Sequence, residues 1–191
     1  MAAIMVLGVC GTLRSQDREW GIAPEIGFSH FSGSSADDTS LSFRPSPSTS
    51  VGLRLDASVH GLVIAVGVLY EETGLMENGP SLAITAHNTI KLLAVHPEVS
   101  LRLLRLGAAN LRLHVGIAIN RWSLVDEKAR SRLGGLGGFS VEAPIGARTT
   151  LQVRWEGSLS RSIFDEGDLP AGFKPRSTFH SRLGLGIRLG L

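Results

Sequence analysis

The residues that could carry out chemistry in this 191-residue chain are few, and the first candidate is a histidine–serine pair. His30 and Ser32 are two positions apart, so in a β-strand both side chains would lie on one face. With an acid beside them, such a pair could activate the serine for attack on a lipid ester. No matching acid or amide lies nearby in the sequence. We therefore expect no catalytic residue, and a lipid-modifying barrel enzyme remains the weakest alternative.

Metal, cofactor and nucleic-acid sites are not indicated. His60, His96, His114 and His180 share the parity that we expect to face inward, but their spacing is not typical of metal ligands. The single cysteine, Cys10, excludes an intramolecular disulfide and a multi-cysteine zinc site. The net charge is +2 and no basic run or stripe is present, so nucleic acid is not an expected partner.

Charged residues alternate with apolar residues along most of the chain. From Val51 to His60, for example, Leu53 and Leu55 occupy one parity while Arg54 and Asp56 occupy the other. Such alternation predicts a strand with one apolar and one polar face. If the polar faces line a lumen, their charges must pair, because a buried charge needs a partner. The predicted lumen charge network comprises Glu25, Arg54, Asp56, Glu71, Glu98, Arg102, Arg112, Glu142, Arg154, Glu156, Arg182 and Arg188.

The alternation predicts eight strands, joined by connections that are alternately long and short. The expected strands are residues 20–31, 51–60, 62–72, 89–105, 111–122, 132–143, 149–163 and 178–191. The long connections are residues 32–50, 73–88, 123–131 and 164–175. An even number of strands of about ten residues, with long and short connections in turn, is typical of outer-membrane barrels. We predict an all-β fold, an eight-stranded antiparallel up-and-down transmembrane β-barrel that the last strand closes against the first, with both termini periplasmic. A bulge is expected at Pro24.

Composition agrees with a barrel better than with a helical membrane protein. Apolar residues make up 43% of the chain and charged residues 19%. No stretch of eighteen residues is apolar and free of charge, as a transmembrane helix would require. Residues 1–15 resemble part of a signal peptide, so the barrel domain is expected over residues 16–191. Four aromatic residues are expected at the level of the lipid headgroups: Trp20, Tyr70, Trp122 and Trp155.

Three stretches resemble the small eight-stranded outer-membrane barrels of the OmpA/OmpX type, the outer membrane protein β-barrel domain or porin-family group. They are Val95 to Leu101, Leu151 to Leu159 and the terminal stretch Leu183 to Leu191. The family usually ends on an aromatic residue, whereas this chain ends on Leu191. The resemblance implies an outer-membrane protein of a Gram-negative-type bacterium. It also implies outer-membrane lipid as a partner, and recognition of Leu183 to Leu191 by the barrel-insertion machinery.

The sequence therefore favours a monomeric, non-enzymatic barrel with a charge-plugged lumen and a structural or surface-interaction role. Two alternatives remain open. A narrow passive pore for small solutes would use the same lumen without a plug. A soluble lipocalin-like barrel would turn its apolar face inward around an apolar ligand, and alternation alone cannot say which face lies inside.

Overall fold

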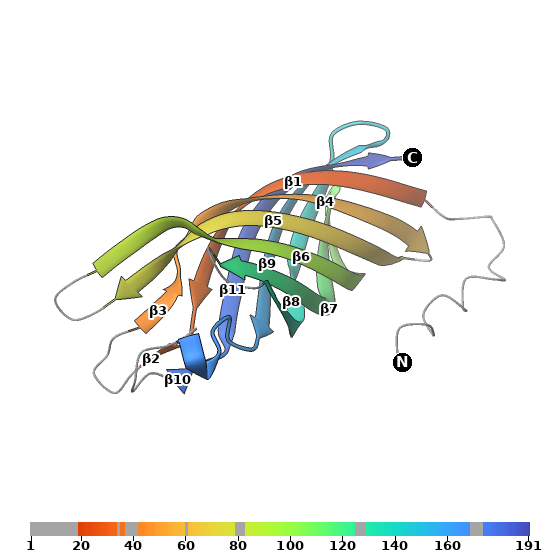
Figure 1. Ribbon diagram of the computed structural model, residues 1–191. Coiled ribbons are helices and arrows are strands. Elements are labelled where there is room, and N and C mark those ends of the chain that lie inside the picture. Colours follow the sequence, from red (N-terminus) through yellow and green to blue (C-terminus); the bar gives the residue numbers. More distant parts are fainter. Residues whose placement is uncertain are drawn as a thin grey trace.

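Eight long antiparallel strands close into a barrel (Figure 1). The computed structural model describes residues 19–33, 35–36, 42–59, 61–78, 83–124, 129–168 and 174–191. The signal-like residues 1–15 and His60 lie outside them. The strands of the ring are β1 (Glu19–Ser32), β4 (Ser48–Val59), β5 (Leu62–Asn78), β6 (Ala83–Leu106), β7 (Ala109–Leu124), β8 (Arg130–Pro144), β9 (Thr149–Ser160) and β11 (Thr178–Gly190). The predicted fold class and strand number are confirmed.

The last strand closes the ring against the first, as predicted. Along the β1–β11 ladder Ile26 lies opposite Leu185, and the amide of Leu191 donates to the carbonyl of Trp20 at 2.9 Å. The prediction of a β-bulge at Pro24 is wrong. The pairs on either side of Pro24 keep one register along β11, and Pro24 itself lies opposite Leu53 on β4. The missing proline N–H interrupts one ladder without adding a residue to the strand.

The apolar faces of the strands point outward. Phe28, Ile64, Val115 and Leu185 are each about half exposed or more, and most of their apolar neighbours on the same parity are exposed as well. Because apolar side chains cover most of the outside of the ring, the exterior suits lipid. The lipocalin-like alternative, which needs this face inside, is wrong. No helix among the described residues is long and apolar enough to cross a membrane.

The end of the barrel with the long connections carries more regular structure than the sequence predicts. Strand β5 continues to Asn78 and β6 starts at Ala83, so the expected connection 73–88 is mostly strand. Three short strands, β2 (Ser35–Ala36), β3 (Ser42–Pro45) and β10 (Lys174–Pro175), and the 3-10 helix η2 (Glu166–Asp168) gather at this end in Figure 1. β3 extends the sheet beside β5, and β2 lies between β3 and β10.

Inward-facing glycines give the lumen side chains their space. A Cβ atom at Gly138 would lie 2.5 Å from Nε2 of His114, closer than van der Waals contact permits. By contrast, Gly135 on the same strand is exposed, and a Cβ there would meet no atom within 4 Å. The difference follows from the alternation of faces along β8.

We predict that Gly138→Val destabilises the barrel by about 1–3 kcal/mol or prevents its folding, because the added methyl groups overpack the lumen. Gly135→Val is the matched control and should change stability little. The measurement is urea unfolding in lipid vesicles, followed by tryptophan fluorescence. Equal losses for both variants would contradict the assignment of faces.

Candidate functional site: paired charges across the lumen

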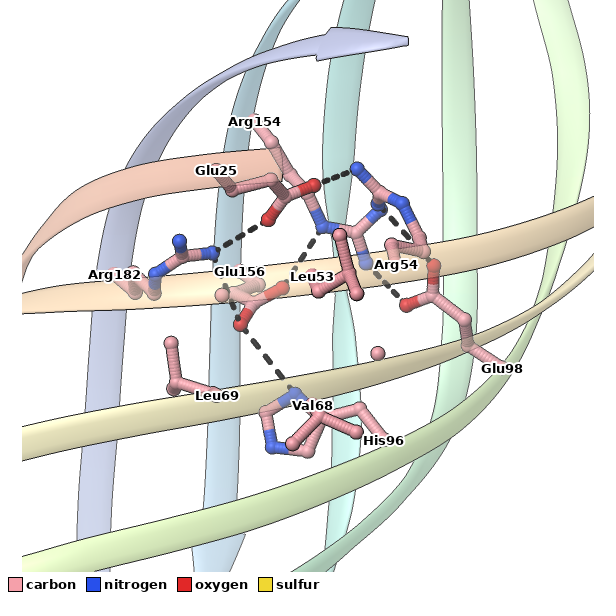
Figure 2. A pocket seen from close by; sticks show the side chains of 12 residues that line it. Glu25, Leu53, Arg54, Val68, Leu69, His96, Glu98, Arg154, Glu156 and Arg182 are labelled. Carbon is pink, nitrogen blue, oxygen red and sulfur yellow. Dashed lines mark hydrogen bonds and ion pairs between the residues drawn. The ribbon is translucent and has the colours of Figure 1, made fainter. Parts of the chain in front are cut away.

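Six of the predicted network residues form a closed ring of alternating charge, which we call the lumen ring (Figure 2). In order around the ring they are Glu25, Arg54, Glu98, Arg154, Glu156 and Arg182. The ion pair between Arg182 and Glu25 closes the ring. They come from β1, β4, β6, β9 and β11. Each acid therefore contacts two arginines, each arginine contacts two acids, and the formal charge of the ring is zero.

The contacts of the lumen ring are close, and its side chains are buried. Arg154 Nε donates to Glu156 at 2.8 Å, and Arg182 Nη1 donates to Glu25 at 3.0 Å and lies 3.8 Å from Glu156. Arg54 contacts Glu98 at 3.4 Å, and the Arg54–Glu25 and Arg154–Glu98 pairs are closer still. Every one of these side chains is at most 9% exposed. Such burial requires this pairing, because an unpaired charge in a low-dielectric interior is costly.

Toward the short turns, a second layer of pairs supports the ring. Arg188 binds Asp56 at 2.7 Å and Arg112 binds Glu142 at 2.8 Å. Gln152 joins the two layers, since its amide accepts from Arg54 at 2.9 Å and donates to Glu142 at 3.1 Å. Gln152 was not among the predicted network residues, because that prediction was limited to charged side chains. The inward parity of Gln152 on β9, two residues before Arg154, was the available signal.

Toward the long connections the lumen becomes apolar. Glu71 accepts from Ser48 and lies 3.5 Å from His180, whose ring stacks on Phe31 with centroids 4.6 Å apart. Beyond Glu71 and His180, a buried apolar cluster fills the barrel. The predicted charge-plugged lumen did not include this cluster. The cluster comprises Phe31, Leu69, Ile90, Leu92, Ala94, Trp122, Ile163 and Phe164.

Two predicted site residues lie elsewhere in the structure than the sequence led us to expect. Trp122 was expected at the lipid interface but is 0% exposed and meets Phe31 edge to face, because its parity on β7 points inward. Arg102 was expected in the lumen network but is exposed. It lies at the rim of the barrel, where the register of the β6–β7 pairing shifts between Arg102 and Leu104. Trp20, Tyr70 and Trp155 do lie on the exterior, and their placement at headgroup level stays a prediction.

Three ring-level side chains have a geometry that resembles a metal site. Ligand atoms of Glu98, His114 and Glu156 lie within 4.8 Å of one another, and His114 makes no hydrogen bond with the described protein. However, Arg154 contacts both carboxylates, so a cation would have to sit beside a guanidinium group. Like charges repel strongly at such distances in a low dielectric. The donor set is therefore matched to arginine rather than to a metal ion.

The histidine–serine pair does not assemble into a hydrolytic site among the described residues. His30 is exposed on the exterior, and its Nε2 lies 3.5 Å from Arg44, a cation, where a triad would need an acid. Arg44 also donates to the carbonyl of Phe31 at 3.1 Å, so it ties β3 to β1. The geometry assigns His30 to this contact between strands.

Comparison with known proteins supports the fold. No protein-family model matches the sequence, and no curated protein matches it either. Among solved structures, Neisserial surface protein A (NspA) matches with 12% identity and a TM-score of 0.60, over 91% of this chain and 99% of that protein. The outer membrane protein OprG from Pseudomonas aeruginosa matches with 11% identity and a TM-score of 0.60, over 90% and 95% of the two chains.

The eight-stranded ring and its apolar exterior give this chain the architecture of the small outer-membrane β-barrels. Its lumen is crossed by the ring of three glutamates and three arginines. At identities of 11–12% the likeness to NspA and OprG establishes the shared architecture.

A further cluster of charges fixes the connection between β9 and β11. Arg130 on β8 pairs with Asp168 of η2, with Nη2 to Oδ1 at 2.9 Å. Arg132 pairs with Asp165 at 2.7 Å and donates to the carbonyl of Ser162 at 2.7 Å. These contacts hold the connection over the apolar cluster, into which Ile163 and Phe164 insert.

We predict that Arg154→Met costs about 3–5 kcal/mol of unfolding free energy, because Glu98 and Glu156 each lose a buried partner. Arg105→Met, at an exposed position, should cost less than about 0.5 kcal/mol. The double variant Arg154→Met/Glu156→Gln keeps the ring neutral and should cost less than the sum of its single changes. Urea unfolding in vesicles measures all of them. Equal stability of the Arg154→Met and Arg105→Met variants would contradict the ring.

The connection should open in acid. Hydrogen bonds from Arg130 lower the pKa of the Asp168 carboxyl group. The contact between Asp168 and Arg130 therefore stabilises the fold at a pH above the ordinary aspartate pKa. This stabilisation is lost as the pH falls through the lowered pKa. We expect pepsin cleavage of the connection to increase below about pH 3.9 in the wild type. Asp168→Asn should be cleaved readily at every pH at which pepsin acts. Identical pH profiles for the two proteins would contradict the role of this pair.

Proposed function

We propose that this chain is a monomeric integral barrel of the outer membrane with a closed lumen, and that it acts through the end carrying the long connections. The observation that supports the closed lumen is the lumen ring, in which every charged group is bonded to two neighbours of opposite sign. Outer-membrane lipid would contact the exterior, and the insertion machinery would recognise Leu183 to Leu191.

Passage of a solute through this lumen would require several strong contacts to break together. The cavities at and below the ring have volumes of about 20 and 60 Å³, enough for a few water molecules at most. An ion entering between Glu98 and Arg154 would separate a buried pair, which is strongly unfavourable. The apolar cluster adds a second barrier above the ring. These features favour the plugged barrel over the narrow pore.

The structure also favours a role at the surface over a role in catalysis. At the long-connection end, β2, β3, β10 and η2 build an ordered platform on the barrel. In outer-membrane barrels this is the end that faces outward from the cell. We therefore propose that this platform meets other molecules while the lumen ring keeps the barrel rigid and closed.

Planar bilayer recording tests the proposal. We expect the purified barrel to give no discrete conductance steps, because neither the ring nor the apolar cluster opens. A heat-shift gel on the same sample must show that the barrel is folded, and a porin recorded in the same membrane is the positive control. Reproducible steps from folded protein would contradict the closed lumen and favour the passive pore.

A further inference from the structure

A basic cleft lies at the long-connection end, between the segments that leave β9 and enter β11. Its volume is about 330 Å³, which is within the range of small-ligand sites. Residues 161–165 form one side, residues 175–177 form the other, and Arg132 from β8 completes it. We call it the arginine cleft.

The arginine cleft carries an excess of positive charge. Among the side chains that the structure describes, its charged lining residues are Arg132, Arg161 and Arg176 against one acid, Asp165. Arg132 is paired with Asp165 at 2.7 Å. Arg161 and Arg176 are exposed, and neither has an ion pair with the described part of the chain. The guanidinium groups of Arg161 and Arg176 therefore line the arginine cleft without an acidic partner among the described residues.

One wall of the cleft is held in shape before any ligand arrives. Ser162 and Phe164 line this wall and are largely buried, and the amide of Phe164 donates to Oγ of Ser162 at 3.1 Å. Phe164 belongs to the apolar cluster, and Arg130 binds Asp168 at the far end of the same connection. Such preorganisation lowers the entropy lost on binding.

The surroundings of the cleft favour an amphiphilic ligand. Arg161 follows Leu159 by two residues, and Leu133 adjoins Arg132. Leu159 and Leu133 are 56% and 67% exposed, and Phe179 lies opposite Leu159 on β11. The lipid-facing apolar surface thus runs up to the cleft. A molecule with an anionic head and an acyl tail could occupy both parts.

We propose that the arginine cleft binds the phosphate group of an anionic membrane lipid, with Arg161 and Arg176 as its principal ligands. Guanidinium groups suit phosphate because their planar fork donates two parallel hydrogen bonds to it. The proposal rests on the membrane location and orientation given under Proposed function. Acyl chains would lie along Leu159 and Leu133, which restricts the ligand to the leaflet at this end.

The test is a titration of the full chain, folded in maltoside micelles, with lipid A that carries two phosphate groups. We expect saturable binding, and an affinity at least about tenfold lower for Arg161→Ala/Arg176→Ala. The matched control is Arg102→Ala/Arg105→Ala, which removes the same charge from exposed positions at the opposite rim and should bind as the wild type does. A heat-shift gel confirms folding of each variant independently of binding, so failure of the barrel and failure of the site are distinguishable.

Three outcomes would overturn the proposal. If both double variants lose affinity equally, the attraction is a general effect of charge. If lipid A stripped of its phosphates binds as tightly, the phosphate is not what is recognised. If inorganic phosphate alone binds the cleft as tightly as the phosphorylated lipid, the ligand is a free anion, and the lipid assignment fails.

Discussion

Charge neutrality within the lumen is the constraint on which the rest of this structure depends. A barrel of eight strands has an interior just wide enough for side chains to fill. Because its exterior faces lipid, the polar half of every alternating strand must lie inside. The lumen ring meets this demand by giving each charge two neighbours of opposite sign. The same contacts link five of the eight strands, from β1 near one end of the chain to β11 at the other.

Other features follow from the room and the partners that the ring needs. The long side chain of Arg182 fits because two inward-facing glycines lie against it, Gly27 on the neighbouring strand β1 and Gly184 two residues along β11. A Cβ atom at either position would lie 3.0 Å or less from Arg182. Gln152 extends the network to the pairs below it. Above the ring, the interior becomes apolar, and Ile163 and Phe164 of the connection after β9 insert into it. The barrel is thus filled by a polar layer and an apolar layer.

The strands could be predicted from the sequence because a period of two is a local property that lipid enforces on every segment. The same parity assigned Glu25, Arg54 and Arg182 to the inward face, and in the structure their side chains are buried and paired. Parity does not give height, however, so it could not show which charges meet, or that Arg102 lies at the rim. Trp122 was misplaced for another reason, since its aromatic character was weighed above its inward parity.

Side-chain nitrogen NMR of the folded barrel, labelled at arginine, tests the lumen ring most directly. The ring predicts that Arg54, Arg154 and Arg182 show resolved guanidinium signals with hindered rotation and slow exchange with solvent, because each is held by two buried carboxylates. Exposed arginines such as Arg105 should give averaged, rapidly exchanging signals in the same spectrum. Averaged signals from all three ring arginines would contradict the account.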